Sequence, residues 1–244
     1  GDPAPPRLAS ARARTAQQHC RKQRNTPEPM SLTARIAAFP KANPFAFNLF
    51  VATGKTSAAD LLTQTVVERR GPGDIDWKRN ASFAVFGFGY LGAFQYWLQV
   101  NMFRRWFAGV DAFANQSVRE KLANRAGMVT AGKQIAFDVL VHLPFMYFPT
   151  FYVVKEAVQG PEGTNAVVDG LRHWVENFSV DQVKMISVWG PADFVIFSVP
   201  MWLRLPTRHV VSFGWTAYVS FLRGASPSDP VDPKTGLKRK PTPM

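Results

Sequence analysis

The sequence has few of the residues from which enzymes build reactive centres. It contains one cysteine, Cys20, and four histidines, none of them spaced as metal ligands. A single cysteine excludes an internal disulfide and a thiolate metal site. A phosphate-cradling glycine loop, a dinucleotide fingerprint and the G-x-S-x-G motif of hydrolases are also missing from the sequence. The sequence therefore predicts a non-enzymatic protein without a metal or other cofactor.

Acidic residues are also scarce. Seventeen Asp and Glu stand against 29 Lys and Arg, which gives a formal net charge of +12. Much of the excess lies near the ends, because residues 1–41 hold eight basic and two acidic residues and residues 225–244 hold four and two. The aromatic residues lie in apolar stretches instead of alternating with Lys and Arg, as a base-stacking surface would require. We therefore expect no nucleic-acid partner.

Composition divides the chain into three parts. Residues 1–41 are rich in Ala, Arg, Pro and Ser and lack an apolar run of signal-peptide length, which is typical of a processed transit peptide or of a solvated linker. Residues 42–222 hold the apolar stretches, and residues 223–244 form a polar, basic C-terminal tail. The mean hydropathy of −0.10 averages over all three parts and hides the apolar middle.

Four apolar zones fill this middle part: 44–67, 81–103, 131–154 and 185–222. The first three approach the roughly 20 residues that an α-helix needs to cross about 30 Å of hydrocarbon. The fourth is longer, and Pro191, Pro200 and Pro206 divide it, so we expect two helical pieces with one net crossing. A soluble helical domain would show polar faces at helical period, whereas residues 81–103 contain no charged residue. The predicted fold is an all-α membrane bundle of about four transmembrane spans.

The basic residues between the spans predict an orientation. With four crossings, the N-terminal tail, residues 104–133 and the C-terminal tail share one side and carry 19 Lys or Arg, against seven on the other side. Basic residues concentrate on the inner side of many membranes. We therefore expect both termini on the matrix or stroma side of an organellar membrane.

The first span carries a polar stripe of four residues, Thr53, Ser57, Asp60 and Gln64, within an arc of roughly 60°. A carboxylate facing lipid is costly, so Asp60 must face the bundle interior, a partner or a water-filled cavity. The stripe can line a pore or proton relay, or it can form interhelical hydrogen bonds, and we favour the second interpretation. Lys55, on another side of this helix, must reach an interface or find an acidic partner that the sequence does not identify.

Small residues in the second span predict close helix packing. Gly89 and Ala93 form a small-xxx-small pair, and Gly87 and Gly92 lie beside them. Such pairs allow two helix backbones to approach each other closely in lipid.

Four charged residues lie inside the later apolar zones, Asp138, Asp193, Arg204 and Arg208. Buried charges need partners, so we expect Asp193 to pair with Arg204 or Arg208 across a bend at Pro200. Alternatively, the arginines lie at a headgroup interface.

Several motifs together resemble a known family. They are Pro44, Asp60 and Gln64 leading into Val67-Glu68-Arg69-Arg70-Gly71, the D-x-x-R pair Asp76 and Arg79, the glycine-rich second span ending at Tyr96-Trp97, the third-span acid and proline Asp138 and Pro144, and the series Trp189, Phe197, Pro200, Arg204, Trp215, Tyr218 and Ser220. Over about residues 42–222 this pattern resembles the family of the Mpv-seventeen protein of the mitochondrial inner membrane and the twenty-two-kilodalton peroxisomal membrane protein.

The resemblance implies a small helical bundle in an organellar membrane, and members of this family are proposed to be weakly selective pores or to affect metabolite and nucleotide balance. This sequence departs from the pattern at Val139 and Asp193, which stand where the family usually has Gln, at Ile196, where it usually has Asn, and at Ala93, where it usually has Pro. Because polar groups expected inside the bundle are partly replaced, we predict an accessory or structural subunit of a larger membrane complex. The mitochondrial inner membrane is the first expectation and a plastid membrane the second, with the basic tails contacting other subunits. The alternative is a weakly selective pore for ions or small metabolites, lined by the polar stripe.

Overall fold

The computed structural model describes residues 31–198 and 201–225, without the side chains of 35–37, 197–198 and 201–206. This part of the chain contains helices and no strand, which confirms the all-α prediction. The chain divides after Pro44 into two compact units. The first contains α2, Leu32–Ala42, which begins where the hydroxyl of Ser31 accepts a hydrogen bond from the backbone of Ala34.

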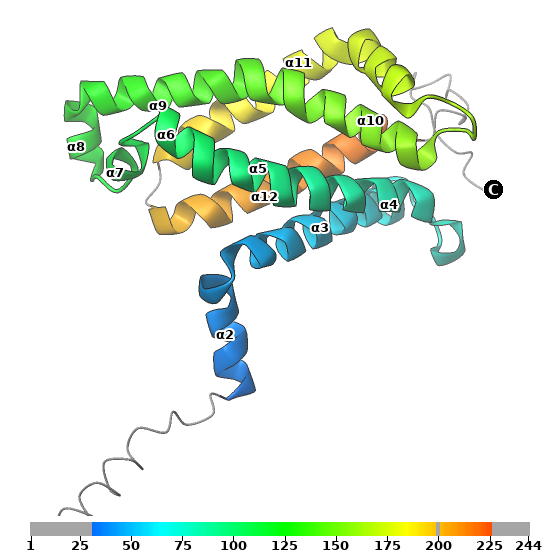
Figure 1. Cartoon of the computed structure of the whole chain (residues 1–244), viewed down its shortest axis with the longest axis horizontal. Coiled ribbons are helices and arrows are strands. Elements are labelled where there is room, and N and C mark those ends of the chain that lie inside the picture. Colours follow the sequence, from blue (N-terminus) through cyan, green and yellow to red (C-terminus); the bar gives the residue numbers. More distant parts are fainter. Residues whose placement is uncertain (1–30, 199–200, 226–244) are drawn as a thin grey trace, which may run out of the picture. The chain divides into compact units, whose positions relative to one another are not determined.

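Five long helical segments make up the described part of the second unit (Figure 1). The first is α3, Pro44–Leu62, continued by the π-helical η1, Thr63–Val67. The second comprises α4, Trp77–Phe86, η3, Gly87–Phe94, α5, Gln95–Trp97, η4, Leu98–Phe103, and α6, Arg104–Trp106. The third comprises α9, Arg125–Phe137, η5, Asp138–Tyr147, and α10, Phe148–Gln159. The fourth and fifth are α11, Ala166–Ser198, and α12, Met201–Arg223.

Short elements connect these segments. A 3₁₀ turn, η2, Pro72–Asp74, precedes α4. Between the second and third segments lie α7, Val110–Ala114, and α8, Val118–Ala123. The side chain of Ser117 accepts from the Glu120 amide while the Glu120 carboxylate accepts from the Ser117 amide, so a capping box starts α8.

The last apolar zone forms two helices, as expected, but their limits and directions differ from the expectation. α11 begins at Ala166, upstream of the apolar zone, and continues through Pro191. Asp181 of α11 contacts Arg223 of α12, and Trp189, later in α11, contacts Arg208, earlier in α12, so the two helices run antiparallel. At 1.5 Å per residue, each is long enough to cross a bilayer. This geometry does not support one net crossing for the zone.

The space between the helices is filled largely by aromatic rings. Phe86 stacks on Tyr90 with a centroid distance of 5.1 Å. It also meets Tyr147 and Phe151 edge-on, at 5.0 and 5.5 Å. These offset and edge-to-face geometries are the favourable ones for aromatic pairs. They join the second and third segments into one core.

Each of the five segments has a long stretch in which no described ionisable side chain is exposed. Stretches without an exposed Asp, Glu, Lys, Arg or His are 44–67, 79–103, 134–159, 177–198 and 207–223. Large apolar side chains are exposed instead, with Phe50 at 78%, Phe88 at 55% and Phe194 at 72%. A helix on the surface of a soluble protein shows the opposite pattern, with charged residues outward.

Length and hydropathy alone select one helix of the described residues as a candidate membrane span. It is Arg125–Gln159, whose 18-residue window has a mean hydropathy of 1.4 and is 50% buried. A core helix of a soluble protein can pass the same test, so the four-span arrangement is not established by hydropathy. The membrane assignment depends on the distribution of exposed side chains.

Candidate functional site

The polar stripe of α3 contains a fully buried carboxylate, Asp60, whose acceptor positions are all occupied. Its Oδ1 accepts from Nε of Arg79 at 2.8 Å and from the hydroxyl of Ser220 at 2.6 Å. Its Oδ2 accepts from the side-chain amides of Gln64 at 2.8 Å and Asn80 at 3.0 Å. Two carboxylate oxygens offer about four lone-pair sites, so Asp60 has no acceptor capacity left.

Arg79 is 1% exposed and uses every one of its donors. Besides the bond to Asp60, Nη1 donates to both carboxylate oxygens of Glu68 at 2.8 and 3.0 Å. Nη2 donates to the carbonyl and the hydroxyl of Ser220 at 3.0 and 2.7 Å. Glu68 also accepts from Nε of Arg70 at 2.8 Å. Two carboxylates are thus balanced by two guanidinium groups, as buried charges require.

We call Asp60, Gln64, Glu68, Arg79, Asn80 and Ser220 the Asp60 network. The start of α4 positions it, because the carboxylate of Asp76 caps this helix by accepting from the backbone of Arg79 at 2.9 Å. The side chain of Gln64 accepts from the backbone N–H of Asp76 at 2.7 Å and donates to its carbonyl at 3.1 Å. In the D-x-x-R motif, Asp76 therefore caps the helix, and the side chain of Arg79 points into the bundle toward Asp60.

The polar stripe serves hydrogen bonding between helices in this structure. Ser57 donates to the side-chain carbonyl of Asn80 at 2.8 Å, and Asp60 and Gln64 belong to the network. Thr53 is separate from them, because its hydroxyl donates to the carbonyl of Leu49 in its own helix. The structure thus brings three of the four stripe residues together.

Close packing of the second segment uses different glycines from the expected pair. A Cβ on Gly87 would lie 2.9 Å from the carbonyl of Ala52, and a Cβ on Gly92 would lie 2.9 Å from Leu49. A Cβ on Gly89 would meet nothing within 4 Å, so of the three glycines predicted to pack closely, Gly87 and Gly92 do so within this chain and Gly89 does not. The stretch is π-helical, and its i→i+5 hydrogen bonding brings residues five apart onto one face.

A second polar chain links η3, η5 and α12. The Nδ1 of His142 lies 2.7 Å from Oδ1 of Asp138, and its Nε2 lies 2.9 Å from the hydroxyl of Tyr90. Because a carboxylate only accepts, Nδ1 carries the proton, and a neutral His142 accepts from Tyr90 at Nε2. The other oxygen of Asp138 lies 3.7 Å from Nη2 of Arg208.

The charged pair expected at Asp193 is different in the structure. Arg208 pairs with Asp138, on another helix, and lies over the ring of Trp189 at 5.9 Å. Asp193 is 1% exposed, and neither of its oxygens has a hydrogen-bond partner among the described residues. The side chain of Arg204 lies outside the described residues.

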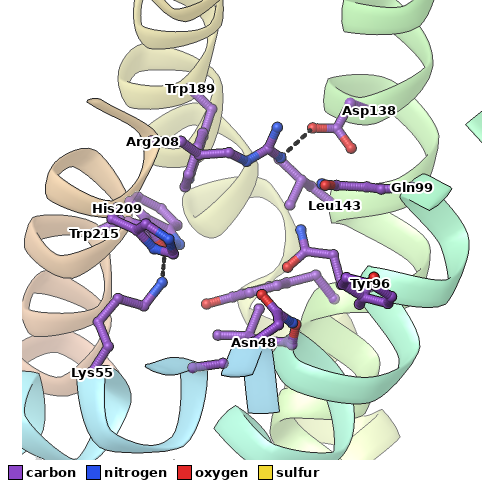
Figure 2. Close-up of a pocket in the computed structure, with 15 residues that line it drawn as sticks. Asn48, Lys55, Tyr96, Gln99, Asp138, Leu143, Trp189, Arg208, His209 and Trp215 are labelled. Atoms are coloured by element: carbon purple, nitrogen blue, oxygen red, sulfur yellow. Dashed lines mark hydrogen bonds and ion pairs between the residues drawn. The ribbon is translucent and has the colours of Figure 1, made fainter. Parts of the chain in front are cut away.

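A cavity of about 90 Å³, lined by both polar and apolar residues, lies beside Asp138 and Arg208 (Figure 2). Lys55 enters it from α3 and donates to the hydroxyl of Ser212 on α12. The remaining polar lining comes from Asn48, Gln95, Tyr96, Gln99, Asp138, Arg208 and His209. Within the described part of the chain, no three His, Cys, Asp or Glu side chains are placed to hold a metal ion.

Sequence analysis identified neither the partners of Asp60 nor this cavity. One signal for the cavity was available in the spacing of polar residues along three separate helices. Asn48 and Lys55 are seven residues apart, Gln95 and Gln99 four, and Arg208 and Ser212 four, so each pair lies on one helical face.

Comparisons with known protein families, with curated proteins and with solved structures find no match for this chain. The resemblance to the Mpv-seventeen family therefore depends on the motif residues alone.

Proposed function

We propose that this chain is a non-enzymatic integral membrane protein of the Mpv-seventeen type, which acts as an accessory or structural subunit of an organellar membrane complex. The observation that carries the proposal is the placement of ionisable groups. Among the described residues, none is exposed in the long stretches given above for the five segments. Asp60 and Arg79 are buried and paired with each other, and the buried Asp138 is bonded to His142. In lipid, polar groups must be satisfied inside the bundle, and apolar side chains face outward.

The Asp60 network favours a structural role over a pore along α3. It joins α3, α4 and α12 through side chains whose hydrogen-bonding capacity is used within the protein. A pore wall needs polar groups that remain available to water and solute. The exposed Phe50, Phe88 and Phe194 can pack against lipid chains or against helices of a neighbouring subunit.

The exposed cations support an orientation. Five exposed cations lie near the connection between the second and third segments: Arg104, Arg105, Arg119, Arg125 and Lys133. Three lie near the connections at the other end of these segments: Arg69, Lys78 and Arg172. We propose that the first group faces the matrix of a mitochondrion, or the stroma as second choice. Five antiparallel crossings keep the start of α3 on that side and put the end of α12 on the opposite side, which changes the expected side of the C-terminus.

The test compares the chain in its native membrane with the purified chain. Extracted in mild detergent, it should migrate with an assembly much larger than its own 27.2 kDa. Purified and placed in a planar bilayer, it should be electrically silent. A conductance that changes in Asp60→Ala, and in the milder stripe variant Ser57→Ala, would support the pore alternative and contradict the subunit proposal.

A further inference from the structure

Lys55 is a partly buried cation that the subunit proposal leaves unexplained. It lies in the middle of α3, and its ammonium donates to the hydroxyl of Ser212. Among the described residues, no carboxylate lies within ion-pair distance of it. An ammonium held inside a lipid-embedded bundle without a counter-charge is costly. A residue of this kind calls for a negative partner.

The charges around Lys55 do not supply one. Arg208 of α12 lies close enough to repel it. Asp138, the one carboxylate in the cavity lining, pairs with Arg208 instead. The lining therefore has one more cation than carboxylates, and the cation without a carboxylate partner is Lys55.

The opposite wall of the cavity offers neutral donors. The side chains of Gln95, Tyr96 and Gln99 line it and form no hydrogen bond with other described residues. Figure 2 shows Tyr96 and Gln99 across the cavity from Lys55. The volume of about 90 Å³ is several times the roughly 10–15 Å³ that one water requires. The cavity thus has room for a group of a few heavy atoms and is too small for a nucleotide.

A second hollow lies next to this cavity. It has a volume of about 440 Å³ and lies under the connection from Phe103 to Asp111. Gln99 and Arg208 line both hollows, so they form the boundary between them. Arg104, whose side chain is 68% exposed, lines the outer hollow at the basic end of the bundle. No residue of the Asp60 network lines either hollow.

We propose that the inner cavity binds a small oxyanion, a phosphate or carboxylate group, which enters past Arg208 and Gln99 and is neutralised by Lys55. Lysine binds phosphate as a compact point charge, and amide and hydroxyl donors complete the contacts. The oxyanion is either a free anion or the headgroup of an anionic lipid, which share this chemistry. The proposal depends on the membrane embedding proposed above, but not on the subunit role.

The experiment measures thermal unfolding of the full chain in phosphatidylcholine nanodiscs. Phosphate replaces chloride at constant ionic strength, and the melting temperature is followed. We expect a saturable rise of about 5 °C at 100 times Kd. Lys55→Met should abolish the rise and should melt above the unsubstituted chain in chloride, because it removes an unpaired buried charge. Lys78→Met, at an exposed position outside the cavity, is the matched control and should respond like the unsubstituted chain.

Two further arms complete the test. Gln99→Leu keeps all charges and should raise the apparent Kd for phosphate about tenfold. This variant tests the proposal if Lys55→Met does not fold. Nanodiscs containing phosphatidic acid show whether the bound oxyanion is a free anion or a lipid headgroup. A rise in melting temperature that depends on Lys55 and occurs without free phosphate points to a lipid headgroup. No rise with either source, or an equal rise in Lys55→Met, would overturn the proposal. A chain that does not reconstitute into nanodiscs would contradict the membrane embedding instead.

Discussion

At the scale of single residues, the charges of Asp60 and Arg79 are buried with their hydrogen-bonding capacity fully used. Asp60 accepts four hydrogen bonds, and Arg79 donates to Asp60, Glu68 and Ser220. Asp60, Arg79 and Ser220 come from three different helical segments. Such a pair contributes little over an apolar core, but removal of one partner leaves the other buried and unpaired. The network is therefore expected to be sensitive to single substitutions.

Asp60→Ala should destabilise the folded bundle by about 3–5 kcal/mol, because it leaves the Arg79 charge without its buried carboxylate. The measurement is denaturant or thermal unfolding in detergent micelles. Asp74→Ala removes an exposed carboxylate in the neighbouring turn and should change stability by less than about 0.5 kcal/mol. If both variants unfold alike, the network does not hold the helices together. In a double-mutant cycle with Arg79→Ala, the two losses should also be far from additive.

Glu120 supplies a pH-dependent contact in the connection between the second and third segments. Two hydrogen bonds from Ser117, the stronger effect coming from its hydroxyl and the weaker from its backbone N–H, hold the pKa of the Glu120 carboxyl below its ordinary value. A carboxyl whose pKa is lower in the folded state stabilises that state above the unfolded pKa, and the stabilisation is lost as the pH falls through the folded pKa.

Hydrogen exchange of the α8 amides should therefore show lower protection factors as the pH falls below about 4. Glu120→Gln keeps an acceptor for the capping box but cannot titrate, so its protection should not follow this pH profile. An unchanged pH profile in Glu120→Gln would show that another group is responsible.

At the scale of elements, the existence of the helices was predictable, and their partners and local register were not. Periodicity places Asp60 and Gln64 on one face of α3, but it does not tell which of the other helices supplies Arg79 or Ser220, 19 and 160 residues away. The short helices α7 and α8 lie between two apolar zones, in a connection whose apolar residues do not recur at helical spacing, so they were not predicted. A π-helical stretch likewise leaves no clear mark in the sequence.

The glycine register offers a matched test. Gly87→Ala would press a methyl group against Thr56 and the carbonyl of Ala52, and should destabilise the bundle by about 1–3 kcal/mol. Gly89→Ala meets nothing within 4 Å and should be neutral or stabilising by up to about 1 kcal/mol. Unfolding of both variants in the same micelles measures the difference. A larger loss for Gly89→Ala would contradict the packing described for this helix.

At the scale of the whole molecule, the number of crossings decides the topology. The antiparallel α11 and α12 make five long segments where the sequence predicted about four spans, because proline positions indicate breaks but not reversals of direction. The C-terminus should therefore lie on the same side of the membrane as Asp74 and on the opposite side from Asp111. Protease added to one side should cut a cleavable tag fused after Met244 only where a reagent added to that side labels Asp74→Cys and not Asp111→Cys. Cleavage from the side of Asp111 would instead indicate an even number of crossings, with both termini on the same side of the membrane, as the sequence predicted.

The central claim, that lipid surrounds the five segments, is tested most directly by cysteine labelling in intact membranes. In a Cys20→Ser background, cysteines replace the exposed apolar residues Phe88, Phe145 and Val210, and Asp111→Cys serves as the water-facing control. A membrane-impermeant maleimide, applied from each side, should modify Asp111→Cys from one side and the three apolar positions from neither, whereas all four should react after denaturation. Modification of the three apolar positions as rapid as that of Asp111→Cys would show that water covers these surfaces and would contradict the account.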